Sequence, residues 1–526
     1  MRRTVCGCIL VLALSSALGQ QDFLDPTFHG TGILTYGNSA FHEERANAVV
    51  VQANGSIVAG GQDFNVNTWT GSWFAFRCTA DGEPDTTFGP NGTGYALYDF
   101  DGLGANDGTI YALDVQATQT SNTILAAGFV NADGAGWKFV VVRLLGDGTL
   151  DPTFSGDGIV FMDLGTDSTE RIATSVKGLP DGRIMAAGFD NDWGLLSARL
   201  LADGTPDTTY APNGLLELNI PGFEFGDACT MINDSGEVFA IATSNGGIVK
   251  LDANGDLDAS FGNNGISTEL AWTVTIPKTL AQRPTGELVI GCLGAYSMID
   301  HRTLVAQFTP SGQLDTTFGF GGVSLPAPGS TLWVNDVVLL PSGRVAVGYQ
   351  GGVDSLESYN FLTAMFSVDG MVDPLWGIGG VLQTDLDTTA NPPFGSNDAM
   401  WGLACQPDGK LVGTGPTAST SDNIGIVRYA PETTLGVAPL SSESASMLVF
   451  PNPCKAGGVL HVNMEATNAR AAFLRDALGR LVATWQLPAG STSTNIQLPV
   501  HLAGGHYVFE MRTEERSMIA RLIIEP

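Results

Sequence analysis

Positive charge is scarce in this sequence. Its 526 residues include 24 Lys and Arg against 54 Asp and Glu, which gives a formal net charge of −30. Proteins that bind the phosphate backbone of nucleic acids carry a basic surface, so this balance argues against a nucleic-acid partner. It fits an exported protein that its charge keeps soluble, or a protein that binds cations.

Cysteine is rare as well. Apart from Cys6 and Cys8 near the N-terminus, the chain holds five cysteines, which are Cys78, Cys229, Cys292, Cys405 and Cys454. Five is an odd number, and none of them shows the short paired spacing of a zinc site. Four lie within apolar runs that resemble strands, so we expect buried thiols rather than a disulfide framework.

Long apolar runs are confined to the N-terminus. Arg2 and Arg3 precede an apolar stretch at residues 5–14, and Ala17 and Gly19 supply small residues before a cleavage point near Gly19. This pattern is typical of a signal peptide. No later stretch reaches the roughly 20 apolar residues of a membrane-spanning helix, so we expect no transmembrane helix.

Glycine, in contrast, is abundant, and much of it belongs to a repeat. The pattern Asp-Gly-x-x-Asp-x-x-Phe recurs with small changes at residues 81–88, 147–154, 203–210, 254–261, 311–318 and 369–376, and a truncated copy stands at residues 25–28. From Asp25 to Asp373 there are 348 residues in six steps, a mean period of 58. A fixed period of this length indicates a repeat architecture.

Each repeat contains the signals for four short strands. In the first, an apolar run at 46–52 leads to an Asn54-Gly55 hairpin turn, a returning strand at 57–61, a third strand at 73–78 and a fourth at 94–98. No segment has a sustained helical period. Seven units of four strands predict an all-β, seven-bladed β-propeller.

The two ends of the repeat region complement each other. The chain opens with the end of a repeat, residues 25–36, and the last repeat stops after its third strand at 424–429. We therefore predict that the N-terminal strand closes the ring as the outer strand of the last blade, which removes both exposed strand edges. Within the motif, Gly82 provides a positive φ, Asp85 accepts backbone hydrogen bonds, and Phe88 packs between neighbouring blades.

These features resemble the delta-60 repeat, a bacterial β-propeller repeat of unassigned activity. The resemblance covers roughly residues 22–432, and residues 171–188, 336–348 and 403–413 match its hairpin best. It implies the fold and leaves the activity open.

A polar stretch at 437–446 precedes a second β-rich region, in which alternating short strands and glycine turns predict a compact sandwich of about seven strands. This region resembles the type A C-terminal sorting domain of type IX secretion. The matching residues are Pro451, Asn452, Pro453, Gly479, Arg480, Gly505 and Tyr507. The resemblance implies export with the type IX secretion machinery as partner, and a location outside the cell or on its outer surface.

The predicted organisation therefore has four parts. Residues 1–19 form the signal peptide, 20–432 the seven-bladed propeller, 433–446 a linker and 447–526 the sorting domain, a small β-sandwich.

Catalytic and metal-binding motifs are missing. The sequence has no Gly-x-Ser-x-Gly, no His-Glu-x-x-His and no complete Gly-x-Gly-x-x-Gly. Asp252, Asn254, Asp256 and Asp258 place oxygens at alternate positions, as a calcium loop does, but the bidentate Glu of an EF-hand loop is absent. Because the same positions are turn residues in other repeats, we favour a structural turn and expect no cofactor, with calcium as the alternative.

Three functions fit these observations. The first is a non-catalytic exported propeller that binds a glycan or a protein through one rim, where longer segments at 62–71, 99–109, 350–358 and 387–397 supply loops. Aromatic residues in or beside them, Trp69, Tyr349, Tyr359 and Phe394, are the candidate contacts. The alternatives are a polysaccharide-active enzyme, marked by three or more acidic or His side chains converging at the funnel mouth, and a purely structural or adhesive surface component.

Overall fold

The computed structural model divides into two compact units, Met1–Glu432 and Thr433–Pro526. The structure describes residues 23–430 and 447–525, except for short gaps at 38–40, 99, 101–104, 118–121, 133–135, 163–168, 226–229, 243–245, 270–274, 298–299, 325–332, 352–359, 374–375, 378–379, 387–397, 419–421, 451–453, 465–470, 477–480, 488–492, 504 and 513–516. Among these residues, no helix is both long and apolar enough to cross a membrane.

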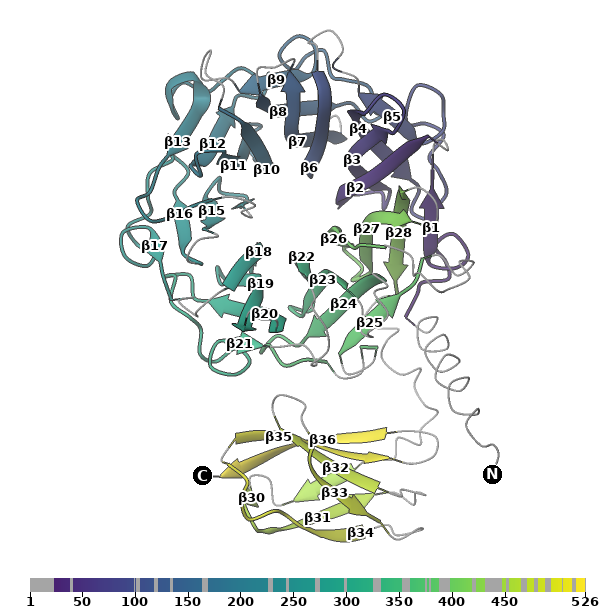
Figure 1. Ribbon diagram of the computed structural model, residues 1–526, viewed down its shortest axis with the longest axis vertical. Helices are drawn as coiled ribbons and strands as arrows, with labels where there is room; N and C mark the ends of the chain where they lie inside the picture. Colours follow the sequence, from purple (N-terminus) through teal and green to yellow (C-terminus); the bar gives the residue numbers. More distant parts are fainter. Residues whose placement is uncertain are drawn as a thin grey trace, which may run out of the picture. The chain divides into compact units, whose positions relative to one another are not determined.

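The described part of the first unit forms seven four-stranded antiparallel sheets, which Figure 1 shows arranged around a common centre. Three of them are β2 (His42–Val51), β3 (Ile57–Asn65), β4 (Thr70–Cys78) and β5 (Tyr95–Tyr98); β6 (Ala105–Ala117), β7 (Asn122–Ala132), β8 (Trp137–Leu144) and β9 (Ile159–Met162); and β10 (Arg171–Gly178), β11 (Ile184–Asp190), β12 (Leu195–Leu200) and β13 (Leu215–Leu218). A short 3-10 helix, Pro212–Gly214, precedes β13.

Three more sheets follow in the same order along the chain. They are β14 (Thr230–Ile232), β15 (Val238–Ile241), β16 (Ile248–Leu251) and β17 (Ile266–Ser267); β18 (Thr275–Gln282), β19 (Leu288–Ser297), β20 (Asp300–Phe308) and β21 (Val323–Ser324); and β22 (Trp333–Leu339), β23 (Val345–Gly351), β24 (Asn360–Phe366) and β25 (Val381–Thr384). In each sheet the first strand is innermost and the fourth outermost (Figure 1).

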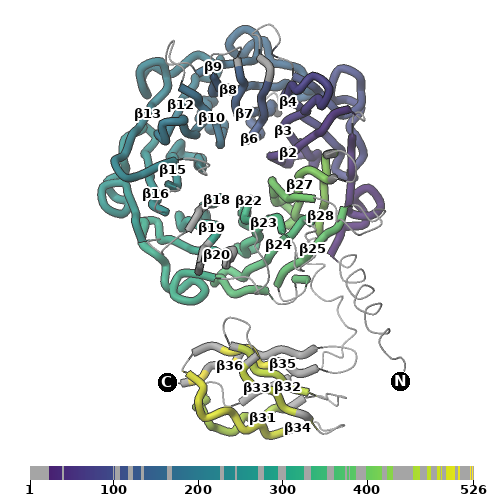
Figure 2. Tube along the Cα trace, viewed as in Figure 1, coloured from purple at the N-terminus to yellow at the C-terminus, as the bar shows by residue number. Residues whose placement is uncertain are grey.

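The remaining sheet combines the two ends of the unit. Its order is β26 (Gly402–Cys405), β27 (Leu411–Ala418), β28 (Asp422–Tyr429) and β1 (Ile33–Tyr36). β1 pairs antiparallel with β28 from Ile33↔Val427 to Tyr36↔Ile424, and the purple and green tubes lie side by side in Figure 2. The outer position of this sheet is therefore occupied by the N-terminal segment.

The repeated motif clamps each third strand to the turn that follows it. In one copy, Arg143 Nε donates to Asp151 Oδ2 at 2.8 Å, and a second guanidinium nitrogen donates to Thr153 Oγ1 at 3.1 Å. The guanidinium also lies 4.6 Å from the centre of the Phe154 ring. Equivalent pairs join Arg77 to Asp85, Arg199 to Asp207, Lys250 to Asp258 and Arg428 to Asp25.

The same motif links each sheet to the next. Phe154 is fully buried, and Gly204 of the following repeat sits against its ring. Gly204 has φ +86°, and a Cβ atom there would lie 2.8 Å from a carbon of that ring. Ser155 N donates to Asp203 O at 2.7 Å across the same boundary. The expected position of the aromatic residue between neighbouring sheets is thus observed.

The second unit consists of two sheets that share one hydrophobic core. The strands are β29 (Met447–Phe450), β31 (Val459–Met464) and β34 (Ser493–Gln497) in one sheet, and β30 (Cys454–Lys455), β36 (Ser517–Glu525), β35 (Gly505–Arg512), β32 (Ala471–Asp476) and β33 (Leu481–Gln486) in the other. Leu460 and Ile496 from the first sheet pack with Leu474, Phe509 and Leu522 from the second, and all five are buried.

Candidate functional site

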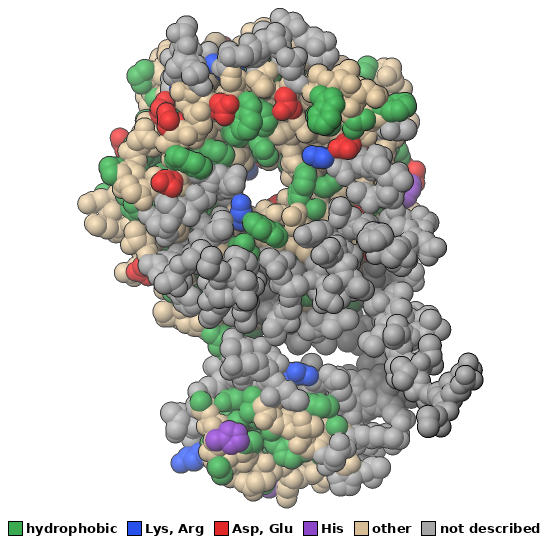
Figure 3. Space-filling view, in the orientation of Figure 1, with side chains coloured by type: hydrophobic (Ala, Val, Ile, Leu, Met, Phe, Trp, Pro, Cys, Tyr) green, Lys and Arg blue, Asp and Glu red, His purple; other side chains and the backbone are tan. Residues whose placement is uncertain are grey.

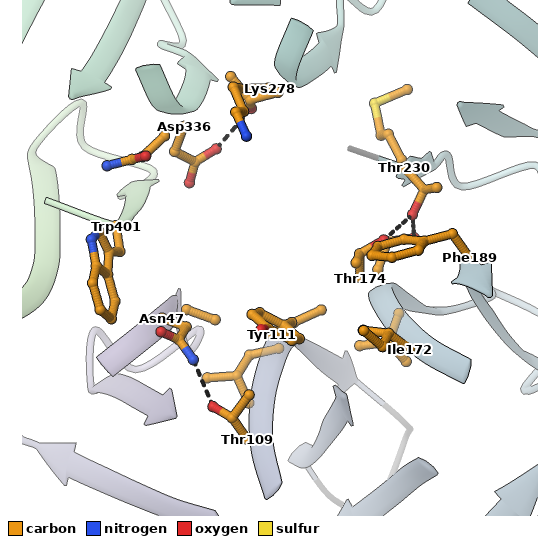
Figure 4. Close-up of a pocket in the computed structure, with 18 of the residues that line it drawn as sticks. Asn47, Thr109, Tyr111, Ile172, Thr174, Phe189, Thr230, Lys278, Asp336 and Trp401 are labelled. Atoms are coloured by element: carbon orange, nitrogen blue, oxygen red, sulfur yellow. Dashed lines mark hydrogen bonds between the residues drawn. The ribbon is translucent and has the colours of Figure 1, made fainter. Parts of the chain in front are cut away.

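A cavity of about 1090 Å³ occupies the centre of the first unit. Figure 3 shows the opening on one face of the ring, and Figure 4 shows side chains from several strands around the space. The wall combines aromatic rings, amides, hydroxyls and a few charged groups. Ligand sites in proteins are concave spaces of about this size that combine apolar surface with a small number of polar groups.

Much of this wall is supplied by one equivalent residue in or just before six of the inner strands. Backbone pairing slips by one residue at this position in the first, second, third, fifth and sixth sheets, which creates a β-bulge. A bulge redirects the extra side chain. The cavity-lining residues at the equivalent positions are Asn47, Tyr111, Thr174, Lys278, Asn335 and, just before β26, Trp401.

A glycine on the second strand permits the bulge. A Cβ atom at Gly188 would lie 1.8 Å from Ile172 O, and one at Gly415 would lie 1.8 Å from Ala399 O. Only glycine allows this approach of two backbones. These glycines therefore help to present the next inward-facing residue, Thr174 or Trp401, to the cavity.

Two of the inward-facing residues are asparagines held in the same way. Asn47 Nδ2 donates to Ile110 O at 2.8 Å and to Thr109 Oγ1 at 2.7 Å. Asn335 Nδ2 donates to Met400 O at 2.7 Å. In both cases the acceptor carbonyl immediately precedes the inward-facing residue of the next sheet. Because the amide nitrogens are used within the protein, each Oδ1 remains an acceptor on the cavity wall.

The aromatic residues beside these amides are positioned by their own contacts. Trp401 Nε1 donates to Gln350 Oε1 at 2.9 Å, which fixes the edge of the indole. Tyr111 is 42% exposed, and its ring centre lies 6.0 Å from that of Phe129. Figure 4 shows Trp401 and Tyr111 on the border of the same space.

The carboxylate of Asp336, the residue after Asn335, joins three inner strands. Asp336 Oδ1 accepts from Val337 N at 2.8 Å and from Thr279 Oγ1 at 3.2 Å, and Oδ2 accepts from Leu403 N at 2.8 Å. Burial raises the pKa of the Asp336 carboxyl to about 6, against the lowering effect of these hydrogen bonds. Lys278, from the preceding sheet, lines the cavity near it (Figure 4).

The other acidic residues of the wall belong to one sheet. Glu170 precedes β10, and Asp190 ends β11. Asp190 Oδ1 accepts from Asp192 N and Gly194 N, so it holds the β11–β12 turn. Asp336 belongs to a different sheet, and Figure 4 places it across the cavity from Phe189 of β11. Asp336 is therefore not grouped with the two carboxylates of the third sheet.

Three exposed tryptophans lie at one end of the sheets. In an antiparallel sheet, the connection between its second and third strands lies at the end where the first strand begins; we call this end the loop face. Trp69 in the β3–β4 connection is 79% exposed, Trp193 in the β11–β12 connection is 50% exposed, and Trp333 at the start of β22 is 40% exposed. Trp69 and Trp193 both have positive φ, +58° and +65°. Trp193 also lines the cavity.

The four aromatic residues expected at the rim have different environments. Trp69 lies on the loop face, where its ring packs at 5.9 Å against that of Phe64. Tyr349 is fully buried in β23, because alternation along the strand directs its ring into the core between sheets. It therefore does not face solvent. Tyr359 and Phe394 lie outside the described residues.

The four candidate calcium ligands adopt the geometry of turn residues. Asp252 Oδ1 accepts from Asn254 N at 2.8 Å and from Asp256 N at 3.1 Å. Asp258 pairs with Lys250 Nζ at 2.7 Å. Among the described residues, no group of three or more His, Cys, Asp and Glu side chains is arranged to hold a metal ion.

The sorting-domain residues are only partly described. Gly505 begins β35, and Tyr507 in the same strand is buried and donates from its hydroxyl to Ala503 O at 2.9 Å. Residues 451–453 and 479–480, which include the Pro-Asn-Pro and Gly-Arg motifs, lie outside the described residues. Of the five cysteines, Cys78, Cys292 and Cys454 are buried thiols, Cys405 is a partly buried one, and Cys229 lies outside the described residues. Burial raises the pKa of Cys78 and Cys292.

The inward-facing positions were missed because they belong to no motif. They do have a signal, since five of them stand eight residues before the glycine of the following hairpin turn: Asn47 and Gly55, Thr174 and Gly182, Lys278 and Gly286, Asn335 and Gly343, Trp401 and Gly409. Residues at a fixed offset in five repeats, but of different types, indicate a surface that the repeats present together.

Comparisons with known proteins agree with this geometry. Residues 448–525 match the family described as secretion system C-terminal sorting domain. Residues 52–88, 119–154 and 179–210 match a β-propeller domain of unknown function, DUF5122. No curated protein matches the chain.

Several solved structures are similar at low identity. A protein of unknown function from Dyadobacter fermentans is 11% identical with a TM-score of 0.39, and the alignment covers 76% of this chain and 98% of that one. Virginiamycin B lyase from Staphylococcus aureus is 9% identical with a TM-score of 0.39 and coverages of 76% and 98%. The WD40 domain of Toxoplasma gondii coronin is 9% identical with a TM-score of 0.41 and coverages of 77% and 89%. Likenesses at this level carry no argument about function.

The sorting domain indicates export by the type IX secretion system to the cell surface or the extracellular space. The chain thus carries a DUF5122 β-propeller domain followed by a C-terminal sorting domain for type IX secretion.

Proposed function

We propose that this protein is an exported β-propeller that binds a glycan or a protein through its loop face, without catalysing a reaction. The observation that carries the proposal is a central cavity of about 1090 Å³ on a face that exposes Trp69, Trp193 and Trp333. Tryptophan is enriched among the residues that dominate binding energy in interfaces.

The proposal includes the architecture that shapes this face. We infer a seven-bladed propeller of delta-60 repeats over residues 20–432, closed by the N-terminal strand as the outer strand of the last blade. The pairing of β1 with β28 supports this inference. We further infer a signal peptide at 1–19, a linker at 433–446 and a sorting domain at 447–526 that engages the type IX secretion machinery at the outer membrane.

The long connections support the choice of face. The segments at 62–71, 99–109, 350–358 and 387–397 join second to third strands or fourth to first strands. The described ends of the strands that these segments join lie on the loop face. Insertions gathered on one face of a repeat ring are typical of a binding surface.

The distribution of carboxylates favours binding over hydrolysis. Oδ1 of Asp190 and both carboxylate oxygens of Asp336 accept from backbone N–H groups, and the two residues belong to different sheets. A glycosidase needs two carboxyl groups facing one bond across about 5–9.5 Å. A purely structural role does not explain the exposed tryptophans and the cavity.

The test is a binding screen of the full chain against an array of glycans and peptides, followed by analysis of the bound material for cleavage. We expect retention of one class of ligand and recovery of it intact. Failure to bind any glycan or peptide would contradict the proposal, and cleavage would convert the site into that of an enzyme.

A further inference from the structure

We propose that Asn335, Trp401, Asn47 and Tyr111 form a carbohydrate-binding arc inside the channel, and that its ligand is an oligosaccharide. The inference rests on the proposed function. Of the two classes of partner proposed there, a glycan or a protein, it selects the glycan. The four residues come from four sheets that follow one another around the ring, those of β22, β26, β2 and β6. Along this arc, amides and aromatic rings alternate.

The arc contains the same arrangement of an asparagine and an aromatic residue twice. Asn47 donates to the carbonyl of Ile110, and Tyr111 follows directly. Asn335 donates to the carbonyl of Met400, and Trp401 follows directly. Each pair therefore places an amide oxygen and an aromatic ring on adjacent inner strands of the cavity wall.

This combination matches the chemistry of a sugar. A pyranose ring presents hydroxyl groups that need acceptors, and an apolar C–H face that packs on aromatic rings. The Oδ1 atoms of Asn47 and Asn335 supply acceptors, since their Nδ2 atoms are used within the protein. Trp401 and Tyr111 supply rigid apolar faces, and rigid aromatic side chains lose little conformational entropy on binding.

The volume of the cavity excludes a folded protein domain as its occupant. About 1090 Å³ is the size of a site for a small or chain-like ligand, and it is too small for a folded domain. Lys278 stands next to Asn335 in the order of the ring, at the equivalent position of β18. Its ammonium group donates to a sugar hydroxyl or, more strongly, to a sugar carboxylate.

The experiment measures binding of the full chain to soluble oligosaccharides of glucose, mannose and galacturonic acid by calorimetry, with an array of peptides in parallel. We expect one oligosaccharide to bind. Trp401→Ala should then weaken binding about tenfold or more, whereas Trp401→Phe retains most of it. Tyr111→Ala alters a residue that is 42% exposed, so it tests the arc without endangering the fold.

The matched control is Val368→Ala, an exposed apolar residue beside the Asp369-Gly370 turn, at the end of the sheet opposite the loop face. It should bind like the unaltered protein. If Lys278→Met weakens the galacturonic acid oligomer more than the neutral ones, Lys278 pairs with a carboxylate, as the arc predicts for an acidic ligand.

Two results would overturn the inference while leaving the proposed function intact. One is retention of peptides with no oligosaccharide bound. The other is oligosaccharide binding that survives Trp401→Ala and Tyr111→Ala unchanged, which would place the site elsewhere on the loop face. Absence of any binding would instead overturn the proposed function itself.

Discussion

Arg428 and Asp25 stand 403 positions apart in the chain, and Arg428 Nε donates to Asp25 Oδ2 at 2.9 Å. The contact repeats the one between Arg143 and Asp151, which are eight positions apart. The guanidinium lies 4.8 Å from the centre of the Phe28 ring, and Arg77, Arg143 and Arg199 lie over the aromatic rings of their own motifs in the same way. The two ends of the first unit are therefore joined by the same set of interactions that these three repeats use internally.

This contact predicts a large effect of a single substitution. The side chains of Arg428 and Asp25 are 3% and 6% exposed. Loss of the guanidinium leaves the buried Asp25 with Lys410 as its remaining cationic partner, and it also removes the hydrogen bond from Arg428 to Ala80 O. Arg428→Ala should lower the free energy of unfolding by about 3 kcal/mol, measured by urea denaturation. The control is Arg183→Ala, which breaks the exposed pair with Asp181 and should cost less than about 1 kcal/mol. Equal effects of the two variants would contradict the prediction.

Replacing two glycines of similar φ by alanine should lower the stability by different amounts, because only one of them packs on an aromatic ring. Gly148 has φ +84°, and a Cβ atom there would lie 2.8 Å from the ring of Phe88. Gly409 has φ +85° with open space around it. Gly409→Ala should cost about 1 kcal/mol of backbone strain. Gly148→Ala should cost a further 1–3 kcal/mol or so, because the ring must move. Thermal unfolding of both variants tests this, and similar midpoints would show that the ring is not held against Gly148.

Removing the hydroxyl group of each of two buried tyrosines should change the free energy of unfolding in opposite directions. The Tyr349 hydroxyl is buried without a hydrogen-bond partner, whereas the Tyr429 hydroxyl lies 3.0 Å from Thr384 Oγ1. Tyr349→Phe removes an unsatisfied polar group and should raise the free energy of unfolding by about 1 kcal/mol. Tyr429→Phe removes a hydrogen bond and should lower it by about 1 kcal/mol. Destabilisation by both substitutions would indicate that Tyr349 has a partner.

The repeated aspartates predict acid sensitivity. The hydrogen bond from Lys250 holds the pKa of Asp258 at about 2, below its ordinary value of 3.8. A depressed pKa stabilises the folded protein above the unfolded value, and this stabilisation is lost as the pH falls through the folded value. Stability should therefore decrease between pH 4 and pH 2, and Asp258→Asn should flatten that part of the profile. A variant profile parallel to that of the unaltered protein would contradict this assignment.

The strands and the joints between sheets could be predicted because they depend on local chemistry. Gly148 and Phe88 recur at fixed positions, so a turn and a packing role follow from the sequence. The inner wall could not be predicted in the same way, because it is formed by residues of different types from different sheets. Trp401 and Asn47 are 354 positions apart, and only the ring brings their strands together. For Tyr349, nearness to a long connection suggested a position on the rim. Its ring is buried, because the alternation of side chains along the strand directs it into the core.

The pairing of β1 with β28 shapes the ring and with it the central cavity. Ile33 and Val427 are opposite each other in this pair. The variant with Ile33→Cys and Val427→Cys should form a disulfide on mild oxidation, detected by mass spectrometry of peptides from the unreduced protein. The variant with Ile33→Cys and Ile424→Cys should not, because Ile424 is opposite Tyr36. Both pairs remaining as free thiols under conditions that keep the protein folded would contradict closure by the N-terminal strand.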